Sequence, residues 1–284
     1  MINWLYDLPI AWLVVVVFSA TLLATTAIYV GVTRLAVGAR AEIFGAVSPG
    51  MLPPLGIVFA LVIGFLAAGV WSNGDSAQLA VSREASALRT TVLLVDSFPK
   101  APAARMRALI RRHIQEAVSQ EWPAMADQHL TLKVVPTALA DALRLALSLQ
   151  PRTEGQAVAQ REITTSLENA LDARRQRIII SESRVNWVKW ASIVVLALLA
   201  LLAIAFVHSG RRATAAIALS IFAAAVAMSL ILVASQDQPF GGPFGINESV
   251  GRRSLLGLRD VCLDEALGDA RCEQAFACGD QTDR

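Results

Sequence analysis

The spacing of three apolar side chains is the feature of this sequence that most directly suggests a function. Ile57, Leu61 and Phe65 fall at positions i, i+4 and i+8, so they share one face of a helix. In a single chain, such a stripe is typical of contact with lipid or with a neighbouring helix. In an oligomer, rings of the same side chains around a central axis would form an apolar constriction that gates ions by dewetting. The chemistry would then be ion passage rather than catalysis.

Motifs for enzymatic chemistry are absent from the sequence. It contains no GxSxG, no Walker loop, no HExxH and no dinucleotide-binding GxGxxG. His113, His129 and His208 are too scattered to form a metal-binding pattern, and His113, beside Arg111 and Arg112, is expected on a solvated helix face. We therefore predict a protein that is not an enzyme, with no catalytic residue, no metal site and no cofactor.

The three cysteines all lie near the C-terminus. The spacing of Cys262, Cys272 and Cys278 matches no zinc pattern with paired close ligands. Free reduced thiols are the favoured interpretation, and a single disulfide is the alternative.

Composition identifies the chain as an integral membrane protein. Of its 284 residues, 55% are hydrophobic and 17% are charged, and its mean hydropathy is +0.53, values that do not fit an ordinary soluble domain. The net charge is +2, and no segment is basic enough to suggest a nucleic-acid partner.

Four segments are long and apolar enough to cross a bilayer, which takes about 20 residues in helical conformation. They cover residues 10–32, 54–71, 187–207 and 213–234, and residues 208–212 form a tight turn between the last two. No ionisable side chain lies near the middle of any span, which argues against a proton-coupled carrier.

These spans predict an all-α fold with four transmembrane helices in two hairpins. Residues 1–72 form the first hairpin and residues 187–234 the second. Residues 73–186 form a helical extramembrane domain between them. Residues 235–284 hold a Pro/Gly motif and an acidic tail.

The extramembrane domain begins as a continuation of the second span. An apolar stripe at steps of four and three predicts that this helix leaves the membrane and packs against another helix. The stripe consists of Val81, Ala85, Leu88, Val92 and Val95.

The remaining helices of this domain are predicted from their prolines and a cap. A second helix ends at Pro123, and Pro136 opens a third. Thr153-x-x-Gln156 has the form of a capping box at the start of a fourth. Because neither proline nor glycine falls between Gln156 and Val207, we expect one uninterrupted helix, about 75 Å long, to run into the third span.

Several separated features resemble one family, the bestrophin-like four-span membrane proteins of bacteria. The resemblance covers about residues 10–245. It is carried by Gly64-Phe65 in the second span, Arg83-Glu84-Ala85 beyond it, Glu121-Trp122-Pro123 in the extramembrane domain, and Asp237-x-Pro239-Phe240-Gly241 after the fourth span.

The more distant similarity to bestrophins themselves implies a homo-oligomeric anion channel, a pentamer in that family. Ile57, Leu61 and Phe65 would form the apolar neck of its pore, and its partners would be lipid, permeant anions and further copies of the chain. No acidic cluster resembles a bestrophin calcium clasp, so calcium gating is not predicted.

Orientation is the point on which the sequence gives conflicting signals. Arginines lie in both hairpin turns and also beside the extramembrane domain. The positive charges on the two sides of the membrane are therefore nearly equal in number, and the positive-inside rule does not decide the orientation. The resemblance implies an inner-membrane protein with the extramembrane domain and both termini in the cytoplasm.

An alternative function from another class fits the same helical pattern. The chain would be a non-conducting membrane anchor or sensor whose helical domain and acidic tail bind a partner protein. A stable ring of about five protomers would favour the pore, and monomers or dimers would favour the anchor.

Overall fold

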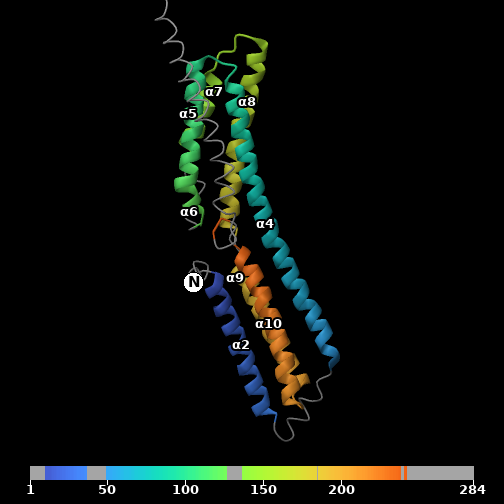
Figure 1. Ribbon diagram of the computed structural model, residues 1–284. Coiled ribbons are helices and arrows are strands. Elements are labelled where there is room, and N and C mark those ends of the chain that lie inside the picture. The colour runs from blue at the N-terminus through green and yellow to red at the C-terminus, as the bar shows by residue number, and fades with distance from the viewer. Residues whose placement is uncertain (1–9, 37–48, 127–135, 184, 238–239, 242–284) are drawn as a thin grey trace, which may run out of the picture. The chain divides into compact units, whose positions relative to one another are not determined.

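The computed structural model describes residues 10–36, 49–126, 136–183, 185–237 and 240–241, and within these ranges the chain is helical and has no strand (Figure 1). The chain divides into two compact units. Unit 1 contains the described residues of Met1–Gly74 and Arg184–Gly245, and unit 2 contains those of Asp75–Ser183.

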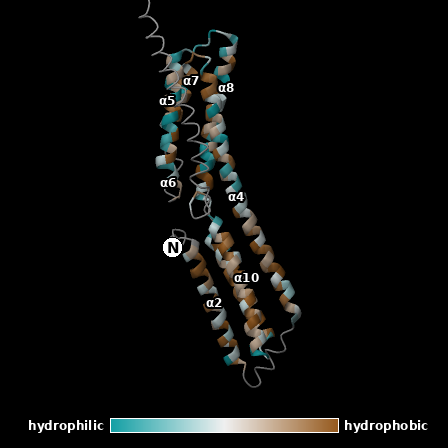
Figure 2. Cartoon of the chain, in the orientation of Figure 1, coloured by the Kyte–Doolittle hydropathy of each residue, from teal (hydrophilic) through white to brown (hydrophobic). Residues whose placement is uncertain are grey.

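Unit 1 consists of four apolar helices, which appear brown in Figure 2. They are α2 (Ile10–Leu35), the first part of α4 (Leu52–Val95), α9 (Trp187–Val207) and α10 (Arg212–Gln236). A single 3-10 turn, η1 (Pro49–Met51), leads into α4. All four are long and apolar enough to cross a membrane. The predicted all-α, four-span, multi-pass membrane fold is therefore confirmed.

Helix α4 is longer than a membrane is thick. Its 44 residues span about 66 Å, roughly twice the 30 Å of a hydrocarbon core. The part before Trp71 is free of charge, and charged residues begin at Asp75. The first part of α4 is therefore the span, and the part from Asp75 onward lies outside the hydrocarbon.

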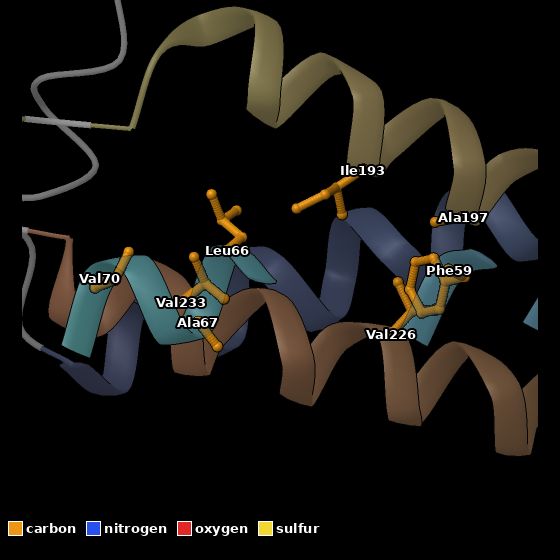
Figure 3. Close-up of a cluster of buried hydrophobic side chains, with 8 residues drawn as sticks. All are labelled: Phe59, Leu66, Ala67, Val70, Ile193, Ala197, Val226 and Val233. Carbon is orange, nitrogen blue, oxygen red and sulfur yellow. The ribbon is translucent and has the colours of Figure 1, made fainter. Parts of the chain in front are cut away.

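The helices of unit 1 pack through small and branched side chains. Helix α10 contacts both α2 and α9. One cluster joins α4 to α9 and α10 and consists of Phe59, Leu66, Ala67, Val70, Ile193, Ala197, Val226 and Val233 (Figure 3). A second joins α2 to the same pair through Val32, Leu201, Ala205, Leu219 and Ala223. The alanines let neighbouring backbones approach closely, as is typical of helix packing in membranes.

Hydroxyl groups within the spans donate hydrogen bonds to backbone carbonyls of their own helices. Thr21 donates a hydrogen bond to the carbonyl of Val17 (2.8 Å), and Ser229 donates to that of Ala225 (2.9 Å). Thr25 and Ser192 bond in the same i−4 pattern. These groups are therefore internally paired and need no partner from another helix.

Unit 2 is a helical bundle. Beside the second part of α4 it contains α5 (Lys100–Glu116), the π-helix η2 (Ala117–Glu121), α6 (Trp122–Ala126), α7 (Thr137–Ser148) and α8 (Glu154–Glu182). Helix α7 packs against both α5 and α8. The predicted apolar stripe of α4 is buried along its whole length, from Val81 to Val95. The continuation of the second span into this unit is therefore confirmed.

The expected end of a helix at Pro123 is wrong. The helical segment passes through this residue and continues in α6 to Ala126. The reason lies in the five residues before α6, which form the π-helix η2. A π turn changes the hydrogen-bond register, so it accommodates the missing N–H of proline and the clash that its ring would cause in an α-helix.

The capping box at the start of α8 is confirmed. The Thr153 hydroxyl accepts a hydrogen bond from the backbone N–H of Gln156 (3.2 Å), while the Gln156 side chain accepts one from the N–H of Arg152 (2.8 Å). The amide group of Gln156 also donates to the carbonyl of Ser97 (2.7 Å). The cap thus ties the start of α8 to the residues that follow α4.

The expected uninterrupted helix from Gln156 to Val207 is also wrong. Helix α8 ends at Glu182 and α9 begins at Trp187. The break is made by polar capping rather than by proline or glycine: the Asn186 side chain accepts a hydrogen bond from the N–H of Val188 (3.3 Å). The residues between the two helices allow them to belong to different units.

Candidate functional site

One face of α4 in unit 1 is left uncovered by the rest of the described chain. Ile57, Leu61 and Phe65 are 60%, 54% and 76% exposed, whereas Phe59 and Leu66 on the opposite face are buried in the core. The three side chains thus share a face, as their spacing predicts. We call them the neck residues, after the pore neck that the resemblance predicts for them.

Small residues accompany the neck residues on this face. Gly64 and Ala68 are both exposed, and a Cβ atom placed on Gly64 would meet no other atom within 4 Å. The absence of a side chain at Gly64 therefore serves no close approach to any part of the chain that the structure describes. It leaves room for whatever lies against this face.

The exposed stripe of α4 continues into unit 2. On the same face of α4 in unit 2, Leu79 and Leu93 are 49% and 62% exposed, and the positions between them at helical spacing are the polar residues Arg83, Ser86 and Thr90. Lipid tails cannot account for exposed leucines here, because this part of α4 lies outside the hydrocarbon. Two leucines exposed on one face of a helix in water offer a small apolar surface that another protein chain could cover.

A second notable feature, in the interior of unit 2, is a cluster of charged side chains. We call it the buried charge cluster, and four helices contribute to it. Its members are Glu84 of α4, His113 of α5, Glu121 of η2, and Arg174 and Arg177 of α8, and all are less than 10% exposed.

Hydrogen bonds and ion pairs connect the whole cluster. His113 Nε2 lies 2.9 Å from Glu84 Oε1. Arg177 pairs with Glu121 at 2.8 Å and, less closely, with Glu84 at 3.2 Å. Arg174 pairs with Glu121 at 2.6 Å. Two carboxylates therefore face two guanidinium groups, and the cluster is balanced in charge when His113 is neutral.

Trp122 closes one side of the cluster. The central guanidinium carbon of Arg177 lies 5.7 Å from the centre of the Trp122 ring, a cation–π distance. Trp122 is itself buried. The ring thus shields the ion pairs of Arg177 from water, which strengthens their electrostatic interactions.

The charge state of Glu84 is set by its neighbours. Burial by itself would raise the pKa of the Glu84 carboxyl above its ordinary value of 4.5, but the Arg177 guanidinium and the hydrogen bond from His113 together outweigh burial and lower this pKa. Glu84 is therefore a carboxylate at neutral pH. It follows that His113 Nε2 carries the proton in their hydrogen bond.

The lowered pKa of Glu84 predicts how stability depends on acid. A carboxyl that is more acidic in the folded state stabilises the fold above its unfolded pKa, and this contribution is lost as the pH falls through the folded pKa. We expect the unfolding free energy of the full chain to fall as the pH drops below 4.5, and the Glu84→Gln variant to lose part of this slope. Urea unfolding at a series of pH values measures this pH dependence of the unfolding free energy, and a variant of an exposed carboxylate, Glu168→Gln, is the control. The same pH dependence in both variants would contradict the lowered pKa of Glu84.

The expectation that His113 lies on a solvated helix face is wrong. His113 is 1% exposed, because it shares the inward face of α5 with Ile110 and Ile114. Arg112, its neighbour in sequence, is the residue that points outward, where it pairs with Glu116. Arg174 and Arg177 were not singled out from the sequence as site residues, although both occupy positions in the apolar period of α8.

A groove opens between α4 and α8 beside the buried charge cluster. It encloses about 550 Å³ and is lined by Arg83, Ser86, Ala87, Thr90, Glu162, Ser166, Asn169, Asp172, Ala173 and Gln176. Eight of these ten residues are polar or charged. The two helices are therefore not packed closely against each other at this level.

The end of α10 is a third region that contains residues singled out from the sequence. Asp237 is buried, and its carboxylate accepts a hydrogen bond from the backbone N–H of Val185 (2.9 Å), which precedes α9. Phe240 is buried and Gly241 is partly buried. Asp237 thus fastens the end of the last span to the start of the third, and Pro239 lies outside the described residues.

Metal binding has no support in the part of the chain that the structure describes. No three of its His, Cys, Asp and Glu side chains lie together as a metal site requires. Cys262, Cys272, Cys278 and His129 lie outside the described residues.

The sequence matches the model of one protein family over most of its length. The Bestrophin-like domain matches residues 17–250. The chain belongs to the bestrophin-like family. Among curated proteins, none matches the sequence significantly.

Solved structures show the same fold as this bestrophin-like chain. A point mutant of a bacterial bestrophin homologue from Klebsiella pneumoniae is 14% identical, with a TM-score of 0.63 over 87% of this chain and 99% of that one. A second structure of that homologue is 15% identical, with a TM-score of 0.61; the match covers 88% of this chain and 98% of that one. A crystal structure of a membrane protein variant is 13% identical, with a TM-score of 0.66 over 86% and 98%.

The residues on which the sequence resemblance rests fall into three places. Glu84 and Trp122 belong to the interior of unit 2, with Pro123 exposed beside them. Gly64 accompanies the neck residues. Asp237, Phe240 and Gly241 lie at the end of α10. The structure thus brings two of the predicted motifs together, Arg83-Glu84-Ala85 and Glu121-Trp122-Pro123, around Arg177.

Proposed function

We propose that this bestrophin-like protein is a homo-oligomeric anion channel, a pentamer in the inner membrane, whose pore neck is formed by Ile57, Leu61 and Phe65. The observation that carries the proposal is the uncovered apolar face of α4 in unit 1, which holds these three side chains; Leu79 and Leu93 are exposed on the same face further along the helix. Its Gly64 and Ala68 leave space between the larger side chains. The resemblance to bestrophins is the reason for proposing that the permeant ion is an anion and that the protomers form a ring.

Physical chemistry supports a gate of this kind. A ring of isoleucine, leucine and phenylalanine side chains offers no hydrogen bond to a hydrated ion, so a narrow passage loses its water and closes to ions without any moving plug. The described part of each span also lacks a buried charge, which a coupled carrier would need. In this proposal the extramembrane domain and both termini lie in the cytoplasm, and the protein carries out no catalysis.

The first test is anion flux through the purified full-length protein. The protein is reconstituted in liposomes loaded with chloride, and efflux is followed with a chloride electrode while valinomycin and potassium balance the charge. We expect efflux above that of empty vesicles. Oligomeric, folded protein that passes no chloride would contradict the channel and favour the alternative function, a membrane anchor whose helical domain binds a partner.

The proposed oligomer leads to a separate prediction for residues of unit 2. If the stripe of α4 lies between protomers, the double variant Leu79→Glu/Leu93→Glu places charges in that contact, and buried unpaired charges are costly. We expect this variant to shift to smaller species in mass photometry of detergent-solubilised protein.

A matched control exists on another helix. Leu147 of α7 is 65% exposed, close to the exposure of Leu93, but it lies off the stripe. Leu147→Glu is expected to leave the oligomer intact. The same shift in both variants, or in neither, would show that the α4 stripe is not the contact.

A further inference from the structure

One end of unit 1 holds three arginines that the proposed pore does not use. Arg34 lies in the last turn of α2, and Arg211 and Arg212 lie at the start of α10. All three are exposed. None of their side chains has a hydrogen-bond or ion-pair partner among the described residues. We call them the arginine cluster.

Packing between α2 and α10 brings the arginines to the same end of unit 1. The two helices contact each other, and Val32, two residues before Arg34, belongs to the same core cluster as Leu219 of α10. Arg212 precedes Leu219 by about two helical turns, so both lie on one face of α10. Figure 1 shows the end of α2, in blue, and the start of α10, in orange, at the lower end of unit 1. Like charges are thus gathered there.

No carboxylate in the described part of this end balances the cluster. The described residues of α2, of α4 before Asp75, of α9 and of α10 include no Asp or Glu. Asp237, which follows the other end of α10, accepts a hydrogen bond from the N–H of Val185. Between α2 and η1 the sequence adds Arg40 and Glu42, whose charges cancel. The positive charge of the cluster therefore remains uncompensated.

The position of Arg211 and Arg212 in α10 adds to this imbalance. The N-terminus of a helix carries a positive partial charge, so cations are favoured at the C-terminus and disfavoured at the N-terminus. Arg34, in the last turn of α2, has the favourable position. Helix α10 has no side-chain cap and no acidic residue in its first turn. Its two arginines therefore indicate an anion that does not belong to this part of the chain.

An exposed apolar face runs from the arginine cluster along α10. Ala213, Ile217 and Ile221 follow one another at steps of four residues, and the two isoleucines are 62% and 68% exposed. On α2, Leu35 beside Arg34 is 52% exposed. Since these helices cross the membrane, the apolar side chains face acyl chains, while the arginines reach the headgroups. A cationic group above an apolar face has the arrangement of a phospholipid site.

We propose that the arginine cluster binds the headgroup of an acidic phospholipid whose acyl chains lie along the exposed face of α10. Guanidinium groups donate paired hydrogen bonds to phosphate oxygens, and basic sites at a membrane surface attract acidic headgroups. The negative charge of the lipid offsets the repulsion among the three arginines. The proposal is independent of the pore, because a non-conducting membrane anchor would bind the lipid in the same way.

The test compares two lipids on the full-length protein, purified in detergent, by native mass spectrometry. Acidic phosphatidylglycerol and zwitterionic phosphatidylcholine with the same acyl chains are titrated separately. Both contain a phosphate, so a preference reports the net negative charge. We expect phosphatidylglycerol to bind at least about 5-fold more tightly, the effect of a single arginine at an acidic surface. Equal affinities in the wild type would overturn the proposal without any variant.

Two triple variants assign the preference to the cluster. Arg34→Gln/Arg211→Gln/Arg212→Gln removes the three charges and should abolish the preference for phosphatidylglycerol. The corresponding triple lysine variant keeps the charges and should retain it. Far-ultraviolet circular dichroism confirms that each variant is folded, and detergent removes any effect of the arginines on membrane orientation. A folded glutamine variant with the full preference would show that the acidic lipid binds elsewhere.

A matched control changes the same amount of charge in unit 2. It replaces three exposed arginines by glutamine, Arg89, Arg105 and Arg161. This control should keep the preference for phosphatidylglycerol. An equal loss in the control and in the glutamine variant of the cluster would show that overall charge, and not a site on unit 1, attracts the lipid.

A last experiment separates a lipid from a soluble anion. Inorganic phosphate is added to the wild type with bound phosphatidylglycerol, and sodium chloride of the same ionic strength is the control. We expect the lipid to stay bound equally in both, because the face of α10 also contacts its acyl chains. Displacement by phosphate alone would overturn the lipid assignment in favour of a site for free phosphate.

Discussion

Replacing Arg177 by alanine should unfold or severely destabilise unit 2. Arg177 is fully buried and pairs with both Glu84 and Glu121. Its removal leaves Glu84 in the core without its guanidinium partner, and breaking a buried pair in this way costs about 3–5 kcal/mol. We expect a loss of this size in the unfolding free energy of the full-length protein, measured by urea unfolding in detergent with far-ultraviolet circular dichroism.

Two further variants test this explanation. Arg175→Ala removes the neighbouring arginine, whose pair with Asp172 is exposed, and should cost less than about 1 kcal/mol. The double variant Glu84→Gln/Arg177→Met removes both charges, so it should be less destabilised than the sum of its single changes. A loss as small in Arg177→Ala as in Arg175→Ala would contradict the role assigned to the buried charge cluster.

A polar neck should conduct better than the natural one. Leu61→Ser places a hydroxyl at the middle of the three neck residues, where it can hold water that leucine excludes. We expect chloride efflux from liposomes to rise several-fold, and Phe65→Ala, which widens the passage, to act in the same direction.

The control for this prediction is an exposed apolar residue on another span. Ile221 of α10 is 68% exposed, close to Phe65 at 76%. Ile221→Ser should leave chloride efflux unchanged, since the side chain belongs to α10 and not to the proposed neck on α4. Equal effects of Leu61→Ser and Ile221→Ser would mean that polar substitutions merely loosen the bundle and that α4 has no special place in conduction.

The spans were predictable because lipid imposes a strong rule on sequence. An uncharged apolar stretch of about 20 residues has few alternatives to a membrane helix, and the third span is observed at the predicted bounds, Trp187–Val207. The stripe from Val81 to Val95 was likewise sufficient to extend α4, because a regular period of buried positions on a helix requires a partner surface.

The local breaks were harder to predict, because they depend on hydrogen bonds rather than on residue type alone. Proline ends helices in general, but the π-helix before α6 accommodates Pro123. Conversely, no proline or glycine separates α8 from α9. The cap from Asn186 and the hydrogen bond from Val185 to Asp237 separate them instead, and the second of these joins residues far apart in sequence.

The buried charge cluster was missed for a related reason. Charged residues are ordinarily solvated, so His113, Arg174 and Arg177 were not expected in a core. A signal was nevertheless present: in α8, Arg174 and Arg177 continue the period of Ile163 and Leu167, which are also buried. A charge at the apolar position of a helix predicts a paired partner, but the sequence does not say that Glu84 and Glu121 supply it.

The most direct test of the central claim asks whether Leu61 lines a water-filled pore. Leu61→Cys and Ile221→Cys are made in full-length protein whose three native cysteines are replaced by serine, and a negatively charged methanethiosulfonate reagent is added to conducting liposomes. We expect the reagent to block chloride efflux through Leu61→Cys and to leave Ile221→Cys unaffected. Conducting Leu61→Cys protein that the reagent neither modifies nor blocks would contradict a pore along α4.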